Sequence, residues 1–282
     1  METVVVDGEN LTLEMVKAVS AGFAEASLSS DSIERMQASR NAVEEILDSG
    51  EIVYGINTGF GALSSVRIEE GQLEELQSNL VRSHACGIGE KMDPELALMM
   101  MTIRANSLAK GVSGIRPSVV AMLLEMVNSR IAPSIPRIGS LGASGDLAPL
   151  SHMTMGMMGE GECLVEVEGK WVLKHSTIAL EEAGLEPIKL QAKEGLSLIN
   201  GTSQMCAYLT ETVLNMETLC LTADASIACS VEAIRGSHKP FDRRVHDSRP
   251  QVGQSISAAR ISGFLSQSNI AISHENCERV QD

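Results

Sequence analysis

The chain has 282 residues, a formal net charge of −15 and 21% charged residues, which suits one large globular domain or two. The negative net charge argues against a surface that binds nucleic acid, because phosphate binding needs clustered Lys and Arg. The longest apolar run, near 96–103, is too short to span a membrane. The first residues are too acidic for a secretory signal, so we expect a cytoplasmic protein. The six cysteines are scattered without a C-x-x-C pair, which predicts reduced thiols and no metal site.

The N-terminal pattern predicts a short strand followed by two helices. β-Branched residues indicate a strand at 3–6, and a helix begins after Thr12. Apolar residues at helical spacing predict a second helix over 31–47, with Gly50 in its C-terminal cap. The simplest arrangement of the two is a helical hairpin.

The segment 53–61 is a loop with three glycines that contains Tyr54, one of only two tyrosines. Composition alone is equally consistent with a surface turn that buries this tyrosine. A helix is predicted over 68–84, and it ends at His84. A histidine at this position commonly complements the helix dipole.

Prolines near the first turn open two further helices, 94–109 and 117–131. The frequent use of Met, 15 residues in all, is typical of a helical core with irregular gaps to fill.

Small residues dominate the next stretch, 139–152, and glycines there allow a strained turn that brings main-chain atoms close together. If the turn presses the nitrogen of Gly145 onto the carbonyl carbon of Ala143, a five-membered ring closes. Loss of water from the ring and from the Ser144 hydroxyl then leaves an exocyclic alkene, an electrophile that no standard side chain provides. A phosphate-binding loop is the alternative, but no Lys follows the glycines as a P-loop requires.

The C-terminal half contains a predicted hairpin and one long periodic segment. Beyond the glycine-rich stretch we expect a helix at 152–158, strands at 164–167 and 171–173, a short helix at 177–183, a polar connection at 237–250 and a helix at 254–274. Residues 193–234 lack proline and predict a long helix or two nearly collinear ones, too apolar to stand outside an oligomer core. By itself, the Asn200–Gly201 pair inside this segment indicates a turn.

Three of these stretches occur together in one known family. The segment 142–150 closely resembles the signature of the aromatic amino acid ammonia-lyases, in which an Ala-Ser-Gly triad cyclises to a methylidene-imidazolone (MIO). The loop 53–61 and the Asn200–Gly201 pair resemble two further signatures, in the correct order. The resemblance implies a mainly α, helical-bundle lyase fold with a small β-hairpin element. It divides the chain into an MIO-bearing domain, 1–200, and the start of a central long-helix domain, 201–282.

The resemblance also implies the roles of individual residues. The triad 143–145 would form the MIO, Tyr54 would remove the substrate β-proton, and Asn200 would hydrogen-bond near the MIO. His84 would orient the substrate, and Gln281 would contact the site from a neighbouring subunit of a homotetramer. The implied substrate is a small amino acid, and no metal is involved.

The Ser83–His84 pair resembles the histidine-specific members, so the expected reaction converts L-histidine to trans-urocanate and ammonia, the first step of histidine degradation. Tyrosine-specific members also carry His there, which leaves a tyrosine or phenylalanine lyase, or an aminomutase, as the alternative.

The resemblance also has a limit at the C-terminal end of the chain. The family's next signature, Gln-Asp-Pro-Tyr-Ser-Leu-Arg, is represented only by Gln281–Asp282. We therefore expect a fragment, or a split-gene product whose partner polypeptide supplies the second half. A shortened, non-catalytic subunit is the remaining alternative.

Overall fold

A computed structural model of the chain describes residues 2–61, 64, 66, 68–141 and 145–274. The chain divides into two compact units, 1–211 and 212–282. In both units helices predominate over short strands, which confirms the predicted fold class.

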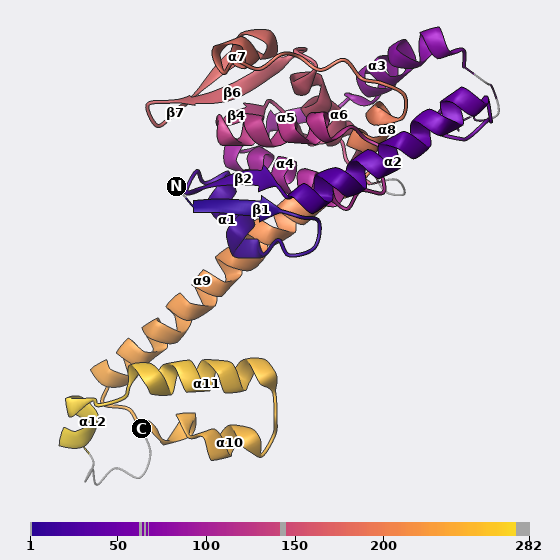
Figure 1. Cartoon of the computed structure of the whole chain (residues 1–282). Helices are drawn as coiled ribbons and strands as arrows, with labels where there is room; N and C mark the ends of the chain where they lie inside the picture. The colour runs from indigo at the N-terminus through magenta and orange to yellow at the C-terminus, as the bar shows by residue number, and fades with distance from the viewer. Residues whose placement is uncertain (1, 62–63, 65, 67, 142–144, 275–282) are drawn as a thin grey trace. The chain divides into compact units, whose positions relative to one another are not determined.

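The first unit opens with two parallel strands, β1 (Glu2–Val6) and β2 (Ala24–Leu28), connected by α1 (Leu13–Ser20) (Figure 1). The expected helical hairpin is therefore wrong, because α1 leads into a strand before α2 (Ser30–Ser49) begins. The sequence of β2 has little strand propensity, so its conformation depends on pairing with β1. The C-terminal cap of α2 is confirmed, since Gly50 has the left-handed φ of 71°.

The other elements of the first unit surround its core or lead to the glycine-rich loop. In chain order they are η2 (Glu70–Gln72), α3 (Leu73–His84), β3 (Ile88–Lys91), α4 (Pro94–Ala109), α5 (Pro117–Asn128), β4 (Ile131–Pro133), β5 (Pro136–Ile138), α6 (Leu147–Met157), β6 (Glu162–Val167), β7 (Lys170–His175), α7 (Ser176–Glu182) and α8 (Glu194–Ile199).

The strands β4, β6 and β7 form one antiparallel sheet, and β3 pairs with β5. The predicted hairpin is confirmed as β6 and β7 (Figure 1). The predicted helix 117–131 is shorter than expected, because α5 ends at Asn128 and Arg130 takes a positive φ of 56° before β4.

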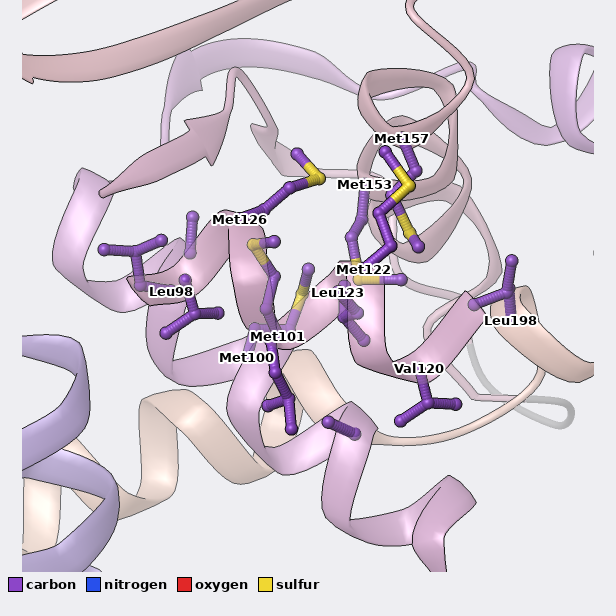
Figure 2. Packing of buried hydrophobic residues seen from close by; sticks show 14 of the residues in the cluster. Leu98, Met100, Met101, Val120, Met122, Leu123, Met126, Met153, Met157 and Leu198 are labelled. Atoms are coloured by element: carbon purple, nitrogen blue, oxygen red, sulfur yellow. The ribbon is translucent and has the colours of Figure 1, made fainter. Parts of the chain in front are cut away.

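The core of the first unit is built around α4, which is buried on nearly every face and contacts α1, α2 and α5. Figure 2 shows methionines from three helices in this core, among them Met100 and Met101 of α4, Met122 and Met126 of α5, and Met153 and Met157 of α6. Unbranched side chains fill the spaces between helices that cross at different angles. The expected methionine-rich helical core is confirmed.

The long periodic segment is two helices, α8 and α9 (Ser203–Ala233), separated at Asn200–Thr202. The part of α9 from Thr212 onward belongs to the second unit. This unit also contains η4 (Lys239–Phe241), α10 (Arg243–Asp247), α11 (Val252–Phe264) and α12 (Asn269–Ser273). The predicted single helix over 254–274 is wrong, because Gln267 takes a φ of 63° between α11 and α12. Within the described residues, no helix is long and apolar enough to cross a membrane.

Candidate active site

Gly145 is the first described residue after the centre of the glycine-rich loop, and its φ is 96°. A Cβ atom at this position would collide with the carbonyl oxygen of Gly201. The backbone N–H of Asp146 donates to the same oxygen, with an N–O distance of 2.6 Å. Only glycine therefore fits at 145, and the loop lies directly against the Asn-Gly turn. The other two residues of the predicted ring, Ala143 and Ser144, lie outside the described residues.

The carboxylate of Asp146 is fully buried and joins three segments. One of its oxygens accepts a hydrogen bond from the hydroxyl of Ser140 at 2.6 Å, and the other accepts one from the backbone N–H of Met205 at 3.0 Å. Asp146 thus connects the start of the loop, the start of α6 and the first turn of α9. No sequence motif had indicated a role for Asp146.

Arg104 lies in α4 and is the second buried charge that the sequence analysis missed. Its Nη2 donates to the carbonyl oxygen of Ser197 and to that of Asn200, the latter at 2.9 Å. Burial lowers the pKa of Arg104 to about 10, and the negative charge of Asp146 opposes this shift. A signal was present, because Arg104 is the only charged residue between Glu95 and Lys110.

Asn200 ends α8, and its backbone N–H donates to the carbonyl of Leu196 at 3.0 Å. The residue as a whole is exposed although its carbonyl is held by Arg104. A Cβ on Gly55 would lie 2.9 Å from a Leu196 methyl carbon, so the loop that carries Tyr54 packs on α8. The structure thereby connects the three predicted segments through α8: 53–61 packs on this helix, and the Asn-Gly turn at its end contacts the end of the glycine-rich loop.

Tyr54 is 60% exposed, so the alternative of a surface turn that buries this tyrosine is wrong. Its ring makes an edge-on contact with Phe60, with 6.3 Å between centroids. The loop around it is held by the buried side chain of Asn57, which accepts the N–H of Val53 at 2.9 Å and donates to the carbonyl of Glu51 at 2.7 Å. The loop is fixed from within, and the phenol stays accessible.

His84 lies in the last turn of α3, where the dipole argument placed it. Its Nδ1 is 2.9 Å from the carbonyl oxygen of Leu80 and 3.0 Å from the hydroxyl of Ser83. A carbonyl oxygen only accepts, so Nδ1 carries the proton and Nε2 is a hydrogen-bond acceptor. This tautomer suits the recognition of a donor on a ligand.

A second histidine connects the segment after His84 to α6. The Nε2 of His152 accepts the backbone N–H of Gly87 at 3.1 Å. Burial lowers the pKa of His152, and the positive charge of Lys91 lowers it further. His152 is thus neutral in its structural role.

In the part of the chain that the structure describes, no group of three His, Cys, Asp or Glu residues is placed to hold a metal ion. The predicted substrate contact Gln281 lies outside the described residues.

The fold and the site define a mainly helical protein in which the end of a glycine-rich loop contacts an Asn-Gly turn, and a loop with an exposed tyrosine packs on the helix that precedes this turn. The family described as aromatic amino acid lyase matches residues 11–282, so the chain belongs to that family.

Named relatives agree with this assignment. The chain is 45% identical over 287 residues to the histidine ammonia-lyase of Anaeromyxobacter sp. (strain K), a match that covers 100% of this chain and 56% of the relative. Among solved structures, it is similar to histidine ammonia-lyase from Trypanosoma cruzi, with a TM-score of 0.86 and 38% identity over 98% of this chain and 53% of that one. Tyrosine aminomutase from Streptomyces globisporus gives a TM-score of 0.87 and 36% identity, over 99% and 54% of the two chains. The chain spans about half the length of the curated relatives it matches.

Proposed function

We propose that this chain is the MIO-bearing half of an ammonia-lyase that converts L-histidine to trans-urocanate and ammonia. The observation that carries the proposal is the contact of Gly145, the third residue of the Ala-Ser-Gly triad, with the Gly201 carbonyl, at a φ that glycine alone adopts readily. The 45% identity to a named histidine ammonia-lyase supports histidine as the substrate.

The residues present fit an MIO formed from 143–145. Ring closure joins the Gly145 nitrogen to the Ala143 carbonyl carbon, and that oxygen leaves as water with the amide protons of Ser144 and Gly145. Ser144 then loses its hydroxyl and its Cα proton as a second water. When formed, the MIO supplies the electrophile that captures the amino acid. The φ of 96° at Gly145, which glycine adopts without strain, supports a tight turn of the kind that ring closure needs.

The side chains around the loop supply proton transfer and orientation. Tyr54 takes the β-proton of the substrate, for which its exposed phenol is accessible. A phenol is only about 0.1% ionised at neutral pH, so the surroundings of the complete site must favour the phenolate. The Nε2 of His84 accepts a hydrogen bond from the ammonium or imidazole N–H of the substrate. Asn200 hydrogen-bonds near the MIO, and Gln281 contacts the substrate from a neighbouring subunit.

The complete site requires further polypeptide, either in a homotetramer or from a second-half chain. Exposed apolar side chains on α9, such as Leu209, Met216 and Leu219, support burial of this helix in an assembly. We propose a cytoplasmic location for the enzyme, in agreement with a catabolic role.

The deciding experiment is the intact mass of the protein produced from its complete gene, with an assay for urocanate from L-histidine. We expect a mass lower by two waters than the sequence requires, and urocanate formation. Ser144→Ala should retain the helical circular dichroism, lose the mass deficit and lose activity. A full mass for the wild-type protein, or activity in Ser144→Ala, would contradict the proposal.

A second candidate is an aminomutase or lyase acting on tyrosine, favoured by the similarity to the Streptomyces globisporus tyrosine aminomutase. Parallel assays with L-tyrosine and L-phenylalanine distinguish the two. Turnover of tyrosine without turnover of histidine would select the second candidate and leave the MIO chemistry in place.

A further inference from the structure

We propose that Arg104 is a positioning residue that holds the Asn200–Gly201 turn in contact with Gly145 and Asp146, and thereby sets the geometry of both the cyclising loop and Asn200. The inference rests on the proposed function and deepens it. It identifies the part of the helical core that fixes the position of the end of the loop.

The first step is the contact between α4 and the Asn-Gly turn. Arg104 donates through Nη2 to the carbonyls of Ser197 and Asn200. A Cβ on Gly201 would collide with its Nη1 and would lie 3.1 Å from its Cζ. The Nη1 edge of the guanidinium therefore lies against Gly201, and a side chain at 201 would have to displace it.

The second step concerns the next peptide of the same turn. The carbonyl oxygen of Gly201 accepts the N–H of Asp146 at 2.6 Å and occupies the space where Gly145 would carry a side chain. The turn thus contacts both the guanidinium of Arg104 and the end of the loop. A displacement of Arg104 would release both contacts together.

The third step concerns charge. Arg104 is 4% exposed, and its Nε has no hydrogen-bond partner among the described residues. The carboxylate of Asp146 interacts favourably with it without appearing among its hydrogen bonds. Burial of a cation with an unpartnered donor lowers the stability of the folded state, so a contribution to stability does not explain this arginine. The arrangement is better explained by the precise placement of two carbonyl groups.

The test compares Arg104→Met with a matched buried arginine. Arg40 is also 4% exposed and donates to the carbonyl of Ala192 at 3.0 Å and to the Gln191 side chain at 3.1 Å. In protein produced from the complete gene, Arg104→Met should reduce the cyclised fraction several-fold and kcat/KM about a hundredfold, because small displacements of reacting groups have effects of that size. Arg40→Met should lower the melting temperature to a similar extent but keep the mass deficit of two waters.

Two further variants keep the result informative if Arg104→Met folds poorly. Arg104→Lys retains the charge but lacks the planar fork, so it should also lose part of the cyclised fraction. Gly201→Ala should reduce cyclisation by displacing the guanidinium, and Arg104→Met combined with Gly201→Ala should be no worse than the more damaging single variant. Additive losses, or a mass deficit equal to the wild type in the Arg104 variants, would overturn the inference.

A separate readout distinguishes this inference from the proposed function. The amide hydrogen of Asp146 should exchange at least tenfold faster in Arg104→Met than in Arg40→Met, whether or not the loop has cyclised. A wild-type protein without the mass deficit contradicts the proposed function only. Equal exchange of the Asp146 amide in the two variants contradicts the positioning role only.

Discussion

Arg116 and Glu194 form a two-pronged ion pair in which Nε and Nη2 of the arginine each lie 2.7 Å from a carboxylate oxygen. The Glu194 side chain is completely buried, and it also accepts the backbone N–H of Gln191 at 2.8 Å. The hydrogen bond to Glu194 raises the pKa of Arg116. Because Glu194 is the first residue of α8, the pair fixes the helix whose other end is Asn200.

Replacing this carboxylate should be strongly destabilising. We expect Glu194→Gln to lower the free energy of unfolding by about 3–5 kcal/mol, since it leaves a partly buried arginine without its counter-charge. Glu95→Gln is the matched control, because the Lys17–Glu95 pair is exposed on both sides and should contribute less than about 1 kcal/mol. Denaturation by urea at fixed protein concentration measures both. Similar losses of unfolding free energy in the two variants would contradict the prediction that the buried ion pair contributes more than the exposed one.

The backbone at Gly145 leads to a second prediction. Gly145→Ala should prevent ring closure and lower the melting temperature, because the new Cβ meets the Gly201 oxygen and φ stays positive. Gly169→Ala is the control, since Gly169 has a φ of 75° but open space around it, and strain alone should cost about 1–2 kcal/mol. Intact mass and thermal melting of the two variants distinguish the effect of the Cβ collision at 145 from the effect of a positive φ alone. Normal cyclisation in Gly145→Ala would show that the contact is unnecessary.

Tyr54 provides a test of catalysis without a change in fold. Tyr54→Phe should lower kcat by about 10²–10⁴-fold, the usual effect of removing an acid–base group. The mass deficit of two waters should remain, and stability should change by less than about 0.5 kcal/mol, because the side chain is largely exposed. Tyr208→Phe, at the other tyrosine in the chain, serves as the control for loss of a phenol. Wild-type turnover in Tyr54→Phe would exclude this residue as the base.

His152 should make stability depend on mildly acidic pH. Burial and Lys91 lower its pKa from 6.5, so the folded state binds fewer protons than the unfolded state as the pH falls below that value. Stability linked to His152 is therefore present above pH 6.5 and is lost as the pH falls through the folded pKa. In His152→Gln, an amide oxygen can accept the Gly87 N–H without titrating, so the acid sensitivity should decrease. Urea midpoints between pH 5 and 8 test this, and identical profiles for both proteins would refute it.

Most helices followed from apolar spacing and caps, whereas β2 and the contacts that hold the turn after α8 did not. Ala24–Leu28 has no alternating apolar pattern and becomes a strand only by pairing with β1. The Asn-Gly pair itself indicated a turn at 200–201, but nothing near it in the sequence indicated that Arg104 and Asp146 hold that turn. Such contacts depend on residues about 50 to 100 positions away, so no local pattern reveals them.

At the candidate site, too, the sequence indicated only part of the arrangement. The chemistry of Ala143, Ser144 and Gly145 predicted an electrophile, whereas the roles of Tyr54 and Asn200 were inferred from resemblance to a family. The structure adds that Gly55 packs on Leu196, which brings the tyrosine loop to α8. Arg104 was overlooked because apolar periodicity identifies helices and does not interpret a single charge inside one.

The helix α4 carries core methionines at 99–101 and, within one further turn, the guanidinium that contacts the Asn-Gly turn. Interior side chains pack at crystal-like density, so a change of volume at Met100 or Met101 shifts the helix that bears Arg104. Core residues remote from the glycine-rich loop are thereby linked to the turn that the loop contacts. In laboratory evolution, substitutions inside the first unit should change the position of this turn as well as heat resistance.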